Sequence, residues 1–322
     1  MKSISASLAA ALLAAACSYA PKVSDDAPRA SDVVQLRWIA KGADRVEVLT
    51  SLPPACETAP PDSATAEKRR LGKIAFESPA LLGGAAARMG LACSSCHLNG
   101  RGNPDFFLEG LSGKPGTADV TSSVLSKVRG NQDFDPRPIP DIALRDGKQI
   151  KDRTGLEFSA KVHGLVEEEF DGQQAPAQVF DAVMAYLDGL DPSACVSQAR
   201  VPLGVERDID AVSAAFRAGS GAELDRASQV FFMRAARFRL ERIHERFAAP
   251  GQAALRERLV RLSRSLGDAA ERIRAGDNPV AEDFIQPEWA EWRAALKAEE
   301  PRSLYNPDVL RAMLAAEEAK KP

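Results

Sequence analysis

Apolar and polar residues recur with helical spacing over most of the chain. A first pattern begins at Ala64, places Leu71, Ile74 and Ala75 on one side, and ends at Ser78-Pro79. Further helices are predicted at 157–170 and 176–190. Helical spacing then continues from 208 to 320, with breaks expected at Pro250-Gly251, 276–279, Pro287 and Pro301. The pattern predicts a mostly α protein whose last part is a bundle of three or four helices.

Two stretches lack this periodicity. Residues 33–50 alternate enough to allow a short strand or an irregular wrap. Residues 99–152 are rich in Gly, Pro, Asn and Asp, with a helical signal only around 120–129. A loop of that length inside a compact domain usually carries function or wraps a ligand.

Composition supports the helical prediction and narrows the function. Of the 322 residues, 45% are hydrophobic and only 6% aromatic, and Ala, Leu, Arg and Glu recur. The 42 Lys and Arg residues are balanced by 45 Asp and Glu residues, which gives a net charge of −3. General nucleic-acid binding, which needs a surface that neutralises phosphates, is therefore not expected.

The first residues resemble an export signal. Lys2 supplies a positive charge, and Leu8–Ala16 is an apolar run too short to span a bilayer. The segment that ends in Cys17 resembles a bacterial lipoprotein box, so we expect cleavage before Cys17 and a lipid on that residue. Cleavage after Ala20 is the alternative. Either reading predicts a periplasmic protein, attached to the membrane only if Cys17 is lipidated.

One motif carries specific chemistry: Cys93-Ser94-Ser95-Cys96-His97. A Cys-x-x-Cys-His run attaches haem c, because the two thiols form thioethers with the vinyl groups and the histidine ligates the iron. A structural zinc site would need two further ligands, and the chain has no second Cys pair. A thioredoxin-like pair would not need His97 and would sit in a βαβ context that the pattern lacks. We therefore predict one covalent haem c with His97 as an iron ligand.

The sixth iron ligand decides between functions. Only three histidines occur, and we expect His163, at the start of a predicted helix, to be the distal ligand; a structural role beside Glu167 is the alternative. His244 lies among charged residues and is expected on a solvated helix face. Met184 has core-like spacing, and Met89 precedes the motif closely enough to lie on the proximal side.

Other polar groups are candidates for roles around the haem. Cationic or amide side chains bind propionates, and the candidates here are Arg101, Asn103, Lys127 and Arg129. The run Glu167–Glu169 could transfer protons to peroxide, but such a run more often forms a solvated helix face. Cys56 and Cys195 remain after the haem thiols and Cys17 are counted, and an oxidising compartment favours a disulfide between them.

The segment Leu71–Pro79 followed by Cys93–His97 resembles the opening of the bacterial di-haem cytochrome c peroxidase superfamily, which includes the methylamine-utilisation maturases. Gly116–Thr121 and Arg137–Asp141 resemble its segment after the first haem, and Val179–Leu190 resembles its closing cytochrome helix. The resemblance covers roughly residues 65–195 and implies a cytochrome c-like helical fold around haem. The family's peroxidases use two haems, whereas this chain has one motif, so turnover by that route would need an external electron source.

Together these observations predict four segments: a signal peptide at 1–16, a tether and extension at 17–62, a cytochrome c-like haem domain at 63–195 and a C-terminal helical domain at 196–322. The expected function is that of an exported mono-haem cytochrome that passes single electrons to a periplasmic redox partner. A peroxidase-type oxidoreductase and a haem-based sensor or assembly subunit are the alternatives.

Overall fold

The structure is a computed structural model that describes residues 33–121, 125–126, 128, 130–143, 156–170, 172–173, 175–195, 199–277 and 281–319. The predicted signal peptide and Cys17 lie outside these residues, as do Lys127 and Arg129.

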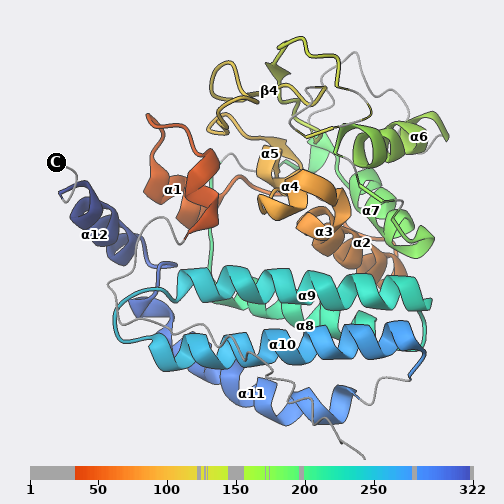
Figure 1. The fold of residues 1–322 in the computed structure, drawn as a ribbon, viewed down its shortest axis with the longest axis vertical. Helices are drawn as coiled ribbons and strands as arrows, with labels where there is room; N and C mark the ends of the chain where they lie inside the picture. The colour runs from red at the N-terminus through yellow and green to blue at the C-terminus, as the bar shows by residue number, and fades with distance from the viewer. Residues whose placement is uncertain are drawn as a thin grey trace, which may run out of the picture.

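The described chain is mostly helical, which confirms the predicted class (Figure 1). The first part contains η2 (Val34–Trp38), α1 (Arg45–Thr50), α2 (Ser63–Phe76), α3 (Pro79–Leu82), α4 (Gly84–Arg88), α5 (Cys93–Cys96), α6 (Leu156–Gly164), the π-helical turn η3 (Leu165–Glu169), α7 (Ala177–Asp188) and η4 (Pro192–Ala194). The second part contains α8 (Val205–Ser220), α9 (Arg226–Arg246), α10 (Ala253–Ala275), α11 (Ala281–Glu299), η5 (Glu300–Arg302) and α12 (Pro307–Glu318). Side-chain caps from Asp62 and Asp225 fix the starts of α2 and α9.

The described strands are two residues long and form antiparallel pairs. β1 (Ser51–Leu52) pairs with β6 (Val201–Pro202), β2 (His97–Leu98) with β3 (Arg101–Gly102), and β4 (Thr117–Ala118) with β5 (Arg137–Pro138). They fasten loops to one another and build no sheet layer.

Several elements differ from the sequence predictions. Residues 33–50 contain η2 and α1 rather than a strand, because Asp44 caps a helix by accepting a hydrogen bond from the Glu47 backbone. The described residues between 120 and 129 are not helical. Helix α11 continues through Pro287, which removes one backbone hydrogen bond without ending the helix. The structure describes five helices after residue 196, α8 to α12, where three or four were expected.

Helices α2 and α7 pack against each other at Gly72. A Cβ atom on Gly72 would lie 1.8 Å from the backbone oxygen of Ala182, so only glycine allows this close approach. One turn further along α2, the Phe76 ring contacts the Tyr186 ring of α7 at a centroid distance of 5.3 Å. The two helices thus form a tightly packed pair.

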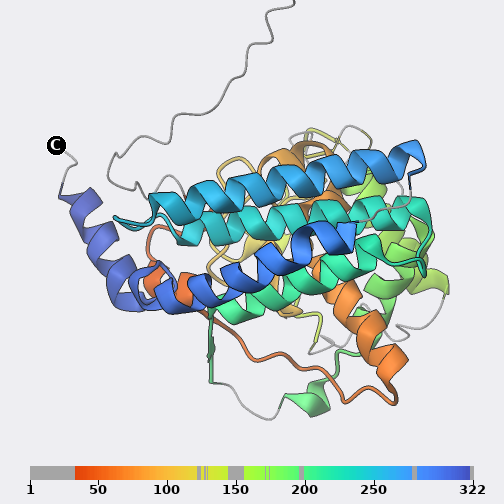
Figure 2. The same cartoon turned by 90° about the horizontal axis from the view of Figure 1, so that it is seen from below.

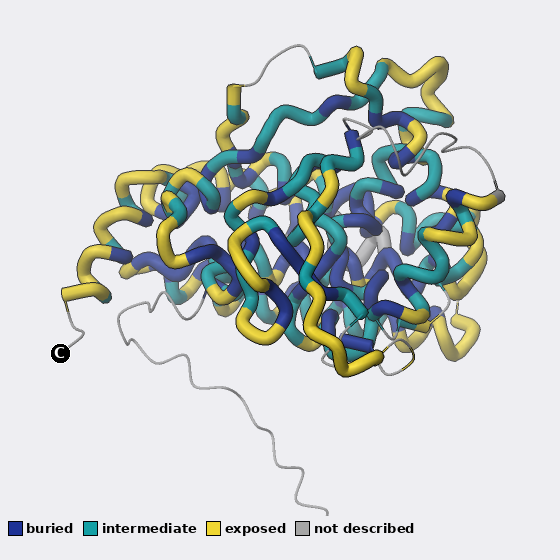
Figure 3. Tube along the Cα trace, turned by 90° about the horizontal axis from the view of Figure 1, so that it is seen from above, coloured by how far each residue is buried: buried dark blue, intermediate teal, exposed yellow. Residues whose placement is uncertain are grey.

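Helices α8, α9, α10 and α11 form a bundle below the first part of the chain, in which α8 and α9 lie nearest to that part (Figures 1 and 2). The main hydrophobic cluster is continuous across the predicted domain boundary at 195/196, since it includes Phe76 and Tyr186 together with Ile209, Phe232 and Trp292. Buried residues lie in the interior, and exposed residues lie both on the loops and on the outer faces of the helices (Figure 3). The two predicted domains share one core.

Two further long-range contacts connect distant segments of the described chain. Val33 and Leu49 form a small cluster with Leu304 and Leu310, so the start of the described chain packs on its last helix. A disulfide joins Cys56 to Cys195, with a Cα–Cα distance of 4.6 Å, which confirms the pairing predicted from the sequence.

A buried ion-pair network also connects α2 to the helical bundle α8–α11. Glu77, which ends α2, pairs with Arg239 of α9 and with Arg207 of α8, the latter at 2.5 Å. Arg239 also binds Asp208 at 2.9 Å, and Asp208 accepts a hydrogen bond from the Tyr305 hydroxyl at 2.5 Å. The side chains of Glu77 and Arg239 are only 8% and 5% exposed. Burial opposes ionisation of Glu77, but Arg207 and Arg239 outweigh it and lower its pKa.

Substitution Glu77→Gln should therefore destabilise the fold by about 3 kcal/mol or more, because it leaves two arginines without their shared carboxylate. Urea unfolding measures this change. The matched control is Glu67→Gln, which removes an exposed ion pair with Arg70 on the same helix and should cost less than about 1 kcal/mol.

The same network predicts the direction of a pH effect. The pKa of Glu77 in the folded protein lies below its ordinary value of 4.5, so its stabilisation is present at neutral pH and is lost as the pH falls below that value. Unfolding of Glu77→Gln should depend less steeply on pH in the acid range. Equal slopes for the two proteins would contradict this role.

Candidate cofactor site

The predicted haem motif forms a single helical turn. Helix α5 spans Cys93–Cys96, and His97 follows as its C-cap. Asn103 donates a hydrogen bond from Nδ2 to the Ser95 backbone oxygen at 2.8 Å and so ties the following loop to this turn. Because residues three positions apart lie on one helix face, Cys93 and Cys96 project from the same side.

A tight hairpin holds His97 in place. His97 pairs with Gly102 and Leu98 with Arg101, and the two-residue loop between them is Asn99-Gly100. Both loop residues have positive φ values, 51° and 76°, which a type I′ turn requires and which Asn-Gly favours. The Asn-Gly pair one residue after the motif is the sequence signal that would have predicted this hairpin.

The imidazole of His97 is oriented by a backbone carbonyl. Its Nδ1 lies 3.0 Å from the Pro140 oxygen. With Nδ1 as the donor to this carbonyl, Nε2 carries the free lone pair, which is the arrangement of most metal-ligating histidines. Burial lowers the pKa of His97 to about 4, although the Pro140 carbonyl and Asp141 oppose that shift. The ring is therefore neutral at physiological pH.

The loop that carries Pro140 is anchored beside the motif. Arg101 donates from Nε to Asp141 at 2.5 Å, and the two side chains are only 12% and 17% exposed. An ion pair between β3 and the residue after Pro140 thus fixes the carbonyl that His97 contacts.

The two thiols of the motif lie in apolar surroundings and are not bonded to each other. Cys93 contacts both the main hydrophobic cluster and a second cluster built around Trp38, Phe106 and Leu125, and Cys96 contacts the second. Burial raises the pKa of each thiol to about 12. These surroundings suit an apolar ring system attached at the two sulfur atoms.

The residues present therefore fit haem c. Two unpaired thiols share one face of a helical turn, an imidazole with a fixed tautomer follows directly, and apolar side chains surround both sulfur atoms.

His163 lies on α6, where its ring stacks on Phe180 of α7 at a centroid distance of 3.4 Å. Its Nδ1 is 3.5 Å from the Glu167 carboxylate, the neighbour expected from the sequence. Nε2 has no hydrogen-bond partner among the described residues. Near it, Val162 and Val166 pack on the main hydrophobic cluster.

The other candidate ligands occupy different places. His244 accepts a hydrogen bond at Nε2 from Arg256 at 3.2 Å on the C-terminal helices. Met184 packs against the main hydrophobic cluster, as its spacing predicts. Met89 contacts the second hydrophobic cluster and lines a cavity behind α5.

The candidate propionate ligands that the structure describes have structural partners: Arg101 binds Asp141 and Asn103 binds the Ser95 backbone. Arg129 lies outside the described residues. Within the predicted solvated glutamate run, Glu168 is exposed and Glu167 half-buried, but Glu169 is only 6% exposed. The π-helical turn turns Glu169 inward, which helical spacing alone does not predict.

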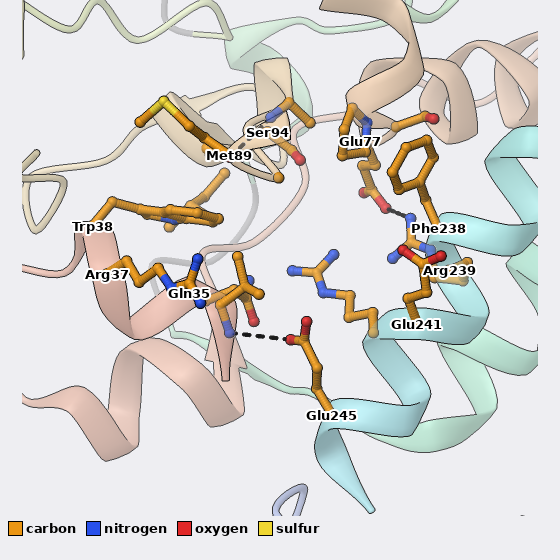
Figure 4. A pocket seen from close by; sticks show the side chains of 18 of the residues that line it. Gln35, Arg37, Trp38, Glu77, Met89, Ser94, Phe238, Arg239, Glu241 and Glu245 are labelled. Carbon is orange, nitrogen blue, oxygen red and sulfur yellow. Dashed lines mark hydrogen bonds and ion pairs between the residues drawn. The ribbon is translucent and has the colours of Figure 1, made fainter. Parts of the chain in front are cut away.

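A cavity of about 490 Å³ lies behind α5. Its wall includes Ser94 and Ser95 but none of Cys93, Cys96 and His97. Figure 4 shows Trp38, Met89 and Ser94 facing Phe238, Glu241 and Glu245 of α9 across this space. Sequence reasoning missed the cavity because it forms between segments some 200 residues apart.

Comparisons with protein-family models, with curated proteins and with solved structures find no match to this chain. The described residues contain no group of three or more His, Cys, Asp or Glu side chains arranged to hold a metal ion. Over that same part of the chain, no helix has the length and apolar character needed to cross a bilayer.

Substitution Arg101→Gln tests how the site is held together. Loss of the Arg101–Asp141 contact should destabilise the chain without haem by roughly 1.5–3 kcal/mol, measured by urea unfolding. The control Arg137→Gln removes an exposed pair with Asp135 nearby and should change little. A loss of stability confined to haem-loaded protein would instead assign Arg101 to a propionate.

Proposed function

We propose that the protein is an exported mono-haem c-type cytochrome that passes single electrons to a periplasmic redox partner. Cys93 and Cys96 would hold haem c covalently, and His97 and His163 would ligate its iron. When bound, the haem supplies a reversible one-electron couple.

The observation that carries the proposal is the contact between His97 Nδ1 and the Pro140 oxygen. It selects the tautomer that leaves Nε2 for iron, and it does so directly after two thiols that share one helix face. A structural CxxC pair has no need for a histidine oriented in this way.

The packing of α2 on α7 also supports a cytochrome c-like domain. The Gly72 and Phe76 positions belong to the motif that resembles the opening helix of the peroxidase superfamily, and they contact Ala182 and Tyr186 of the helix that resembles its closing one. Two sequence segments chosen separately for their resemblance are thus neighbours in space. We therefore also propose that residues 63–195 adopt a cytochrome c-like fold.

A peroxidase-type activity is the second candidate, and one observation favours it. Glu169 is buried in a π-helical turn, and such turns often occur at functional sites. A carboxyl at this position could exchange a proton with peroxide only if the sixth iron position were open.

The ferric absorbance and electron paramagnetic resonance spectra separate these functions. With two histidine ligands the spectrum should be low-spin and should not change on addition of cyanide, carbon monoxide or peroxide. Substitution His163→Ala should convert it to high-spin and allow carbon monoxide to bind the reduced protein.

The matched control is His244→Ala, which removes a histidine bonded to Arg256 and should leave the spectrum unchanged. A high-spin wild-type spectrum together with peroxide-dependent oxidation of an electron donor would support the peroxidase. If His163→Ala stays low-spin, another group is the distal ligand.

A further inference from the structure

The cavity behind α5 is lined by an arginine that no carboxylate contacts directly. Arg242 of α9 is half-buried and makes no hydrogen bond or ion pair with any described residue. Arg239 and Arg246 are neighbouring cations, and the carboxylates of Asp208 and Glu77 act on Arg242 only from beyond ion-pair distance, because both of them pair with Arg239. Burial, followed by the charge of Arg239, lowers the pKa of Arg242. An arginine remains protonated even so, and a partly buried cation among cations is stabilised by an anion.

The remaining charges around the cavity do not supply that anion. Glu77 is already shared between Arg207 and Arg239. Glu245 accepts a hydrogen bond from the Val34 backbone, and burial raises its pKa to about 7. Glu241 also lines the cavity, but no ion pair joins it to Arg242.

Two further arginines line the cavity. Arg37 and Arg88 are exposed, and neither has a hydrogen bond or ion pair within the described parts of the chain. With Arg239 and Arg242, the lining contains four guanidinium groups and three carboxyl groups, those of Glu77, Glu241 and Glu245.

Part of the wall is apolar and aromatic, beside polar groups such as Gln35, Ser94 and Asn103. Trp38 and Met89 lie on one side and Phe238 on the other (Figure 4). A cavity of about 490 Å³ lies in the size range of small-molecule sites, which usually combine an apolar lining with a few polar groups that fix the ligand.

We propose that this cavity binds a small carboxylic acid with an apolar or aromatic body, whose carboxylate pairs with Arg242 and whose body packs between Trp38 and Phe238. A guanidinium group matches a carboxylate through two parallel hydrogen bonds, and an aromatic wall accommodates a flat apolar body.

The cavity adjoins the haem site, since Trp38 and Met89 line it and also belong to the cluster that Cys93 and Cys96 contact. Cys93 and Cys96 project from one face of α5, whereas the cavity touches Ser94 and Ser95 of the same turn. A ligand there would lie against the back of the haem-attachment helix. Ligand binding in this cavity does not depend on the electron-transfer function proposed for the haem.

Isothermal titration of the full, haem-loaded chain with benzoate tests the proposal, with benzyl alcohol as the matched neutral probe. Benzoate should bind at least about tenfold more tightly than benzyl alcohol. Arg242→Gln should weaken benzoate binding about tenfold or more. The control Arg234→Gln changes an exposed arginine on the same helix, away from the cavity, and should leave binding unchanged.

Arg242→Lys provides a second variant that keeps the positive charge, and it should still bind benzoate less tightly because an ammonium group lacks the two-point contact. Absence of benzoate binding, equal binding of benzyl alcohol, or an equal loss in Arg234→Gln would overturn the proposal. Benzoate binding to the haem-free chain but not to the haem-loaded chain would also overturn it. A haem propionate would then be the carboxylate that pairs with Arg242 in the loaded protein.

Discussion

The hydrogen bond between His97 and the Pro140 carbonyl is the interaction on which the candidate site depends. It fixes the imidazole tautomer, and three neighbouring features hold its two partners in place: the Asn99-Gly100 turn, the bond from Asn103 to Ser95 and the Arg101–Asp141 ion pair. A Cys-x-x-Cys-His motif in an unstructured loop would have to order these groups when haem binds. Here the chain alone orders them, which reduces the entropy cost of forming the site.

The helical bundle α8–α11 is connected to this site by side-chain contacts. Glu77 connects the end of α2 to α8 and α9, and Arg207, one of its partners, also reaches the Asn99 side chain at 3.4 Å. Asn99 belongs to the hairpin that carries His97. The cavity behind α5 lies between the same two parts of the molecule, so a ligand bound there would contact both α9 and the Cys93–Cys96 turn. This arrangement gives the C-terminal helices a structural connection to the candidate site.

Local patterns predicted much of the fold. The helical class, the segment ending at Ser78-Pro79, the helix before Leu190 and the Cys56–Cys195 disulfide followed from periodicity, turn residues and cysteine count. Long-range partners did not. Nothing local marks Pro140 as the acceptor for His97, because the choice depends on how a loop 43 residues away folds back. Likewise, Glu77 and Arg239 look like surface charges until α2 and α9 pack together and bury them.

We have proposed that Cys93 and Cys96 hold one porphyrin and that His97 ligates its iron. The most direct measurement is the intact mass and pyridine haemochrome spectrum of protein produced together with a periplasmic haem-attachment system, followed by alkylation of the denatured chain. We expect a mass increase of one haem per chain, a c-type haemochrome, and no alkylation at Cys93 or Cys96. A colourless protein in which both thiols alkylate would contradict it.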